Sequence, residues 1–382
     1  MSQTNLLKKI VILNTWHNSF DDRVFYHQAK TLAENGFEIQ IISTKDNCQK
    51  KVENISINSF DDNKFKRKDK IAKITNLLTL FSPDVIICDS PLAVFASNKY
   101  KKRKKVKIIY DITEWYPSKI HLKNKNGYQK MLKYILCVFI NLFAGFKSDS
   151  FIFGEYYKSI EFRKLFFWKQ YLKLPYYPNV NYIQYYPFEK ITTEINILYS
   201  GKINSDKGID SVLGAIKIAA QKCPEIQFKL KIIGNLLSEE DQYLFNGLVS
   251  ELNKNIHISK INSLPFLDFC KTIGKTDLFI DLRKIDFENT HCLPIKLFYY
   301  LACGRPVIYS SLKSIKKEIE NFNFGYLSDP SDMHSIAGHI MDYITHPDIH
   351  SEHAKNALIA SKSIYDWNLI DKKFISFIEN QG

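Results

Sequence analysis

The stretch at residues 289–308 decides the fold, and it reads Asn-Thr-His-Cys-Leu-Pro-Ile-Lys-Leu-Phe-Tyr-Tyr-Leu-Ala-Cys-Gly-Arg-Pro-Val-Ile. The pattern predicts a loop, a compact helix over 296–302, a tight turn at Gly304 and then a buried strand. Pro294 fits a first helical turn, where a missing N–H costs nothing. Free N–H groups and the positive dipole end of such a helix favour an anion, and Lys296 adds a full charge. The stretch therefore predicts a phosphate site, with an ordinary strand–helix–strand unit as the alternative.

Short apolar runs alternate with helical patterns along most of the chain. Strands are predicted at 9–14, 38–43, 84–88, 106–110 and 150–153, and again at 195–199, 228–233, 256–259 and 277–281. This alternation predicts α/β architecture with mostly parallel sheets covered by helices on both faces. Residues 154–193 interrupt the rhythm, and the interdomain connection is expected within about 176–193.

The chain has 382 residues, which is long for a single core. We therefore expect two Rossmann-like domains facing a central cleft. The first comprises residues 1–180 and the second comprises residues 194–365.

The charge of the chain is strongly positive and clustered. The formal net charge is +13 at pH 7, and basic residues gather at 64–70, 99–107 and 119–130. Such charge favours nucleotides, nucleic acid or an anionic membrane face as partners. Each basic block on its own can be explained as a solvated helix end. Three blocks in one half of the chain, however, favour a common binding surface for an anionic partner. Without a recognised motif for it, we expect no nucleic-acid partner.

The cysteine pattern and the apolar runs bear on localisation. No C-x-x-C pair occurs among Cys48, Cys88, Cys137, Cys223, Cys270, Cys292 and Cys303, which is typical of a reducing compartment. The longest apolar run, 131–146, is shorter than a spanning helix, so we expect a buried helix, with an interfacial role as the alternative. The expectation is a cytoplasmic protein without a signal peptide, and a peripheral position at the inner face of the cell membrane is left open.

A glycine- and lysine-containing turn follows the predicted strand at 195–199. It contains Gly201, Lys202, Lys207 and Gly208, and a helix begins directly after it. Backbone N–H groups in such a turn form an anion site, and the two lysines would neutralise a diphosphate. Solvated turn lysines are the alternative, but the turn and Lys296 can meet at one edge of a doubly wound sheet.

Two polar segments follow strands of the first half. The first contains Trp16, His17, Asp21, Asp22 and Arg23, where one aspartate is expected to cap the next helix and Arg23 can fork to a carboxylate or phosphate.

The second segment contains Asp111, Glu114, Trp115 and Tyr116. Its carboxylates can hold sugar hydroxyls or act as a base, its aromatic rings can stack on a sugar face, and a capped turn is the alternative. We find no convincing metal-ligand set or Ser/His/Asp arrangement.

Taken together and in this order, these segments resemble the family-4, or group 1, glycosyltransferases of the GT-B fold. The matching motifs are Asp21-Asp22-Arg23-Val24-Phe25, residues 111–117, Pro178-Asn179, residues 200–208, residues 293–307 and Tyr365-Asp366-Trp367. The resemblance implies retaining transfer of a sugar from a nucleotide-sugar to a glycan or lipid-linked acceptor in polysaccharide biosynthesis. It implies no metal and no cofactor, and it assigns the donor to the second domain and the acceptor to the first. It also implies that the last helix, about 366–382, crosses back to the first domain.

The resemblance also assigns roles to individual residues. Catalytic roles fall on Asp111, Thr113, Glu114, Lys202 and Lys207; donor binding on Gly201, Gly208, Gly234, Asn289, His291, Ile295, Lys296 and Tyr299; and acceptor binding on Trp16, His17, Asp21, Asp22, Arg23 and Trp115.

Three positions depart from the family pattern. Tyr299 and His291 stand where the family has carboxylates that hold the ribose, and Thr113 stands where many members have a histidine. A phenol makes single hydrogen bonds and cannot chelate a diol as a carboxylate does. These departures motivate two alternatives: a non-catalytic accessory or glycan-binding subunit, and a nucleotide-sugar epimerase on the same fold.

Overall fold

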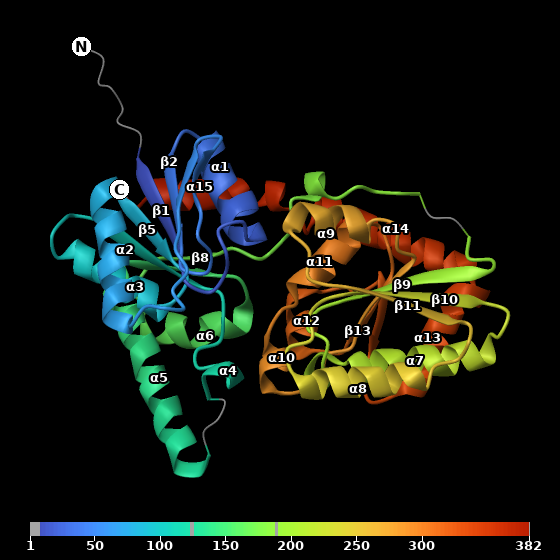
Figure 1. Cartoon of the computed structure of the whole chain (residues 1–382). Helices are drawn as coiled ribbons and strands as arrows, with labels where there is room; N and C mark the ends of the chain where they lie inside the picture. Colours follow the sequence, from blue (N-terminus) through green and yellow to red (C-terminus); the bar gives the residue numbers. More distant parts are fainter. Residues whose placement is uncertain (1–7, 123–125, 188–189, 382) are drawn as a thin grey trace. The chain divides into compact units, whose positions relative to one another are not determined.

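The structure is a computed structural model that describes residues 8–122, 126–187 and 190–381 (Figure 1). Lys123 and Lys125, part of the third basic block, lie outside the described residues. The chain divides into two compact units. The first unit is Met1–Tyr176 with Ile370–Gly382, and the second is Tyr177–Leu369.

The first unit is built on an eight-stranded sheet. Its strands are β1 (Lys9–Asn14), β2 (Glu38–Ser43), β3 (Gln49–Val52), β4 (Ile55–Asn58), β5 (Val85–Cys88), β6 (Lys107–Ile112), β7 (Ser150–Phe153) and β8 (Tyr171–Lys173). The order is β3-β4-β2-β1-β5-β6-β7-β8, and all pairs are parallel except β3 with β4. Strand β1 therefore lies between β2 and β5, which marks the topological switch point of this sheet.

Helices cover the first sheet. They are the π-helix η1 (Asp22–Ala29), α1 (Lys30–Glu34), α2 (Arg67–Phe81), α3 (Pro91–Lys101), α4 (Lys119–Leu122), α5 (Gly127–Lys147), α6 (Tyr156–Leu165) and α15 (Asp371–Glu379). The last of these confirms the prediction that the C-terminal helix returns to the first domain. Lys8 Nζ donates to the carbonyl oxygen of Ile378 at 2.9 Å, and Ser150 Oγ donates to Gln381 Oε1 at 2.9 Å.

The second unit is built on a six-stranded, fully parallel sheet. Its strands are β9 (Glu194–Ser200), β10 (Gln227–Ile233), β11 (Ile256–Ile261), β12 (Leu278–Asp281), β13 (Val307–Ser310) and β14 (Gly325–Ser328). The order is β11-β10-β9-β12-β13-β14. The chain reverses direction across the sheet at β9, which lies between β10 and β12, so the switch point is here.

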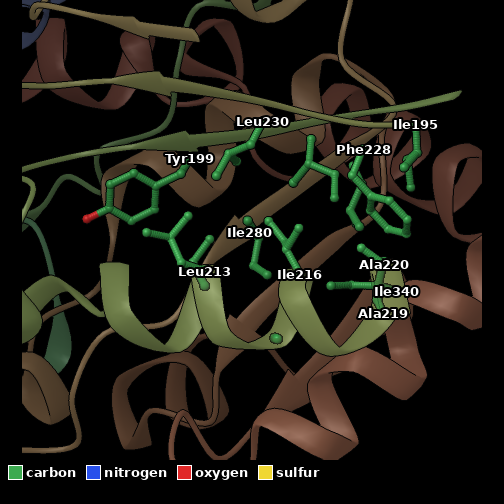
Figure 2. Close-up of a cluster of buried hydrophobic side chains, with 14 of the residues drawn as sticks. Ile195, Tyr199, Leu213, Ile216, Ala219, Ala220, Phe228, Leu230, Ile280 and Ile340 are labelled. Carbon is green, nitrogen blue, oxygen red and sulfur yellow. The ribbon is translucent and has the colours of Figure 1, made fainter. Parts of the chain in front are cut away.

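The helices of the second unit pack on its sheet and enclose two apolar cores. The helices are α7 (Ile209–Lys222), α8 (Glu239–Ser250), α9 (Phe266–Ile273), α10 (Phe287–His291), α11 (Ile295–Ala302), α12 (Lys313–Glu318), α13 (Met333–Thr345) and α14 (Pro347–Ser363), with short 3-10 turns η2 (Val180–Tyr182), η3 (Ser205–Lys207) and η4 (Trp367–Leu369). One core packs α7 and α13 on the sheet (Figure 2), and the other packs α9, α11 and α14. In Figure 2 the ring of Tyr199 lies inside the first core beside Leu213.

The fold differs from the sequence expectation in three elements. The alternation does not break at residue 154, because α6 and the edge strand β8 continue the first unit up to Lys173. The hairpin strand β3 was not predicted, since its residues are mostly exposed and polar and lack apolar alternation. Asn289–His291 was expected to be a loop, but these residues end α10, whose N-cap residue Asp286 accepts a hydrogen bond from the N–H of Asn289.

The apolar run at 131–146 is not a buried helix. It forms most of α5, whose buried residues are only Cys137, Asn141, Ala144 and Gly145. Its large apolar side chains are exposed, which reverses the expectation from hydrophobicity alone.

A glycine at position 208 is required by the backbone. Gly208 has φ +74°, and a Cβ there would lie 1.5 Å from the carbonyl oxygen of Leu282. We expect Gly208→Ala to destabilise the protein by about 2 kcal/mol or more, from the left-handed conformation and the clash. Gly247→Ala, in α8 with no atom within 4 Å, is the control. Thermal unfolding should show a lower Tm for the first variant only, and equal Tm values would contradict the close packing.

Candidate functional site

The turn after β9 is held in shape by Tyr199. Its hydroxyl donates to the carbonyl oxygens of Lys202 at 2.7 Å and Lys207 at 3.2 Å. Close backbone packing also holds the turn in place, because a Cβ on Gly234 would lie 1.7 Å from the carbonyl oxygen of Gly201. The predicted glycines at 201, 208 and 234 therefore let three backbone segments approach each other at the carboxyl end of the sheet.

Lys207 connects the turn after β9 to α10. Its Nζ donates to Asn289 Oδ1 at 2.8 Å, and Asn289 Nδ2 donates to the carbonyl oxygens of Asp206 at 3.3 Å and Lys284 at 3.0 Å. The buried amide of Asn289 thus ties together segments that are more than 80 residues apart. Two predicted site residues, Lys207 and Asn289, are direct partners.

Arg283 is a cation that sequence reasoning missed. It follows β12, at the switch point, and its guanidinium pairs with Asp281 at 3.2 Å. Asp281 also accepts a hydrogen bond from the Tyr309 hydroxyl at 2.6 Å. The signal in the sequence was its position, since a charged residue directly after a buried parallel strand faces the usual ligand edge.

Four cations gather at this edge of the second unit. Burial lowers the pKa of Lys207, and the positive charges of Arg283 and Lys202 lower it further. The Lys296 ammonium lies 3.9 Å from the place that a Cβ on Gly201 would occupy. We call Lys202, Lys207, Arg283 and Lys296 the cationic site. The carboxylate of Asp281 offsets part of this positive charge, and the remaining cations favour an anion at this edge.

Tyr299 is buried and takes no part in this surface. Only 3% of the residue is exposed, and its ring packs edge-on against Phe266 and Phe269 of α9. His291 is half-buried, and its Nδ1 lies 2.7 Å from the carbonyl oxygen of Phe287. That nitrogen must carry the proton, so Nε2 is the acceptor in the neutral ring. Ile295, the first residue of α11, is exposed.

Titratable groups also meet at the switch point of the first unit. His17 Nδ1 lies 3.4 Å from Asp21 Oδ2. Burial favours the neutral ring, but the carboxylates of Asp21, Asp89, Glu114 and Asp22 outweigh it and raise the pKa of His17. We call His17, Asp21, Asp89 and Glu114 the histidine–carboxylate site.

Asp89 was missed by sequence reasoning. It follows β5 and accepts hydrogen bonds from the backbone N–H groups of Thr15 at 2.7 Å and Trp16 at 3.0 Å. Burial nevertheless raises its pKa to about 6. Asp21 is the helix cap that was expected, accepting from the N–H of Arg23, and burial with the neighbouring Asp22 raises its pKa to about 6.

Arg23 and Asp111 form a buried ion pair. Arg23 donates to both carboxylate oxygens of Asp111 at 2.9 Å, Gln28 Nε2 donates to Asp111 at 2.8 Å, and the guanidinium lies 4.0 Å from the Tyr176 ring centroid. Asp111 is 3% exposed. The structure therefore places this pair inside the first unit, with their charges satisfied by each other.

The remaining predicted residues of the first unit lie around this pair. Lys158 Nζ donates to the carbonyl oxygen of Thr113 at 2.5 Å, and the Thr113 hydroxyl is buried without a hydrogen-bond partner in the structure. Glu114 is exposed, Trp115 is half-buried, and Trp16 packs edge-on against His121 at 5.1 Å. Within residues 8–122, 126–187 and 190–381, no group of His, Cys, Asp and Glu could hold a metal ion.

Comparisons with known proteins agree with this architecture. Residues 187–359 match the family described as glycosyl transferases group 1. No curated protein matches the chain significantly. Sucrose-phosphate synthase from Thermosynechococcus elongatus superposes with a TM-score of 0.75 at 13% identity, over 98% of both chains.

Two further structures carry nucleotides. Anabaena HepE in complex with UDP and glucose has a TM-score of 0.73 at 12% identity, covering 98% of this chain and 100% of that chain. An Escherichia coli structure described as trehalose-6-phosphate bound with UDP-2-fluoro glucose has a TM-score of 0.70 at 10% identity, covering 97% and 99%. At such low identity these likenesses show the fold.

The fold and the family match define the class. The chain has the GT-B fold, and its residues 187–359 match the group 1 glycosyl transferases. Both agree with the resemblance that the sequence motifs indicated.

The buried pair allows a test of whether Arg23 is structural. Arg23→Ala leaves Asp111 charged and buried, so we expect a loss of about 3–5 kcal/mol in the free energy of unfolding. Lys229→Ala breaks the exposed pair with Glu194 and should leave the stability almost unchanged, because exposed ion pairs contribute little. Thermal unfolding of both variants measures the difference, and a mild effect of Arg23→Ala would leave acceptor binding as its role.

Proposed function

We propose that this protein transfers a glycosyl group from a nucleoside-diphosphate sugar, with uridine as the base, to a glycan or lipid-linked acceptor in polysaccharide biosynthesis. The observation that carries the proposal is the cationic site at the switch point of the region that matches the group 1 glycosyl transferases. The UDP complexes of structures with the same fold support the choice of base.

The proposed chemistry follows from where charge develops. Cleavage of the bond between the anomeric carbon and the diphosphate oxygen leaves negative charge on the departing nucleotide. Lys202, Lys207 and Arg283 are fixed cations that stabilise this charge before any solvent has to reorganise. Lys296 and the N-terminus of α11 add to the same field. The reaction is proposed to need neither a metal ion nor a cofactor, because the cations supply the charge that a metal would.

Acceptor recognition is proposed for the first unit. The histidine–carboxylate site offers oxygen and nitrogen atoms that hold sugar hydroxyls, and Trp16 and Trp115 offer aromatic faces beside it. Asp22 adds to the negative field at His17. An acceptor hydroxyl loses its proton during transfer, and a group that binds protons near neutral pH suits that step. Retention at the anomeric carbon is inferred from the family resemblance alone.

The ribose is proposed to be held without the usual carboxylate. Tyr299 is enclosed by aromatic rings, so the role falls to His291, whose Nε2 accepts one hydrogen bond from a ribose hydroxyl. Ile295, exposed at the start of α11, offers apolar contact to the nucleoside.

A non-catalytic GT-B subunit is the second candidate. Thr113 and Tyr299 favour it, because both replace ionisable groups expected for donor chemistry. A nucleotide-sugar epimerase is the third candidate.

Thermal shift with a panel of nucleotide-sugars, followed by assays of slow hydrolysis, separates an enzyme from an accessory subunit. Stabilisation with turnover supports an enzyme, and no stabilisation by any donor supports the accessory role.

The cationic site makes a direct prediction for nucleotide affinity. Lys202→Ala and Lys207→Ala should each weaken UDP binding about tenfold or more and abolish turnover, since each removes a charge-assisted contact to phosphate. Isothermal titration calorimetry with UDP measures the affinity. Lys222→Ala removes an exposed lysine at the far end of α7, the helix that follows this turn, and should leave affinity unchanged. Unaltered affinity in the first two variants would move the diphosphate elsewhere.

The buried position of Tyr299 predicts the outcome of restoring the family carboxylate. Tyr299→Glu should lower the Tm by several degrees without tightening UDP binding, because a carboxylate among Phe266, Phe269 and Leu293 is desolvated. Tyr299→Phe keeps the ring contacts and should retain most of the affinity. Calorimetry on both variants tests this, and tighter UDP binding by Tyr299→Glu would show that the helix can present residue 299 to the ribose.

A further inference from the structure

Helix α5 exposes a continuous apolar stripe. The stripe consists of Tyr128, Leu132, Ile135, Phe139, Phe143 and Phe146, which are between 38% and 72% exposed. Their spacing of three or four residues places them on one side of the helix. Figure 1 shows α5 extending beyond the neighbouring helices α3 and α6 of the first unit. Soluble proteins seldom expose apolar side chains in such a contiguous row.

The opposite side of α5 is fixed to the sheet. Cys137, Asn141 and Ala144 are buried there, again at intervals of four and three. The Tyr110 hydroxyl of β6 donates to Asn141 Oδ1 at 2.7 Å, and Asn141 Nδ2 donates to the carbonyl oxygen of Tyr116 at 3.3 Å. These hydrogen bonds fix the orientation of α5 about its own axis. The apolar stripe is therefore held outward by the fold, with a polar residue directed inward.

A second element extends the apolar surface. The turn after α6 exposes Phe167 by 81% and Trp168 by 59%. Lys169, the next residue, donates from Nζ to the carbonyl oxygens of Gly145 at 2.8 Å and Phe146 at 2.9 Å. The turn is thus tied to the C-terminal end of α5. We call the stripe, Phe167 and Trp168 together the apolar face.

The charges around this face are positive. Helix α5 carries Lys130, Lys133 and Lys147 and no acidic residue. The ammonium of Lys147 lies 5.1 Å from the ring centroid of Phe143, and the exposed Arg163 and Lys164 precede the aromatic turn. Aromatic and aliphatic side chains bordered by lysine and arginine match an interface with an apolar interior and anionic headgroups.

We propose that the apolar face docks this protein onto an anionic lipid bilayer, with α5 lying in the interface plane. By length and composition alone, α5 could cross a membrane. It lies flat instead, because its other side is bonded to the sheet and it connects β6 to β7, which are paired in register. The rings of Phe139, Phe143 and Trp168 enter the acyl boundary, and the basic side chains remain among the headgroups.

This docking surface is independent of the proposed reaction. It extends the alternative raised by the sequence, in which the apolar run at 131–146 has an interfacial role, because the exposed turn after α6 adds Phe167 and Trp168 to the surface. Here the apolar face supplies the binding area and the neighbouring cations supply the preference for anionic lipid.

Vesicle sedimentation with the full-length protein tests the proposal. Wild type should bind phosphatidylcholine vesicles containing phosphatidylglycerol more tightly than pure phosphatidylcholine vesicles, and salt should weaken the difference. The double variant Phe139→Gln/Phe143→Gln should partition at least tenfold less. Leu80→Gln, an 84% exposed leucine on α2 outside the face, is the matched control and should bind as wild type does. All the side chains changed are exposed, and circular dichroism checks that each variant is folded.

The basic side chains have their own test. Lys130→Gln and Lys164→Gln should each reduce binding to the anionic vesicles about fivefold while leaving binding to pure phosphatidylcholine unchanged. Equal vesicle binding by wild type and the double phenylalanine variant would overturn the proposal. So would an absence of vesicle binding together with a concentration-dependent dimer, seen in sedimentation velocity, that the double variant abolishes. That result would assign the face to a second copy of the chain.

Discussion

The contact between Gly208 and the backbone of Leu282 is the constraint on which the second unit's site depends. It brings the turn after β9 against the segment after β12, with no room for a side chain between them. Lys207 and Asn289 then connect the same two segments through side chains. Cations that follow separate strands are thereby brought to one edge of the sheet, where their like charges lower the pKa of Lys207.

The switch point of the first sheet also collects side chains that follow separate strands, but these side chains are of a different kind. There β1 and β5 flank the switch point, and the residues after them are His17, Asp21 and Asp89. One unit thus presents cations at the carboxyl ends of its strands, and the other presents a histidine among carboxylates. Charges of opposite sign on the two units suit a reaction in which one substrate carries phosphates and the other carries hydroxyl groups.

Helix α5 shows that an apolar run of sequence can lie on the surface of a fold instead of in its core. Its small and polar residues face the sheet, while its phenylalanines face outward. Asn141 is decisive, because its two hydrogen bonds would be lost if the helix rotated to bury the stripe. The sheet that carries the histidine–carboxylate site therefore also carries the apolar face, so membrane docking and acceptor recognition would belong to one rigid unit.

The sequence by itself determined most of the strands, the two-unit α/β organisation and the turn at Gly304, because periodicity and glycine conformation act over a few residues. It also singled out Lys207 as a candidate phosphate ligand from the local pattern of its turn, and that role stays a prediction. Only the tertiary structure decided that Arg23 pairs with Asp111, that Tyr299 is enclosed by aromatic rings, and that α5 faces outward. Each of these depends on partners far away in the chain, and burial and rotation are fixed by such partners rather than by neighbouring residues.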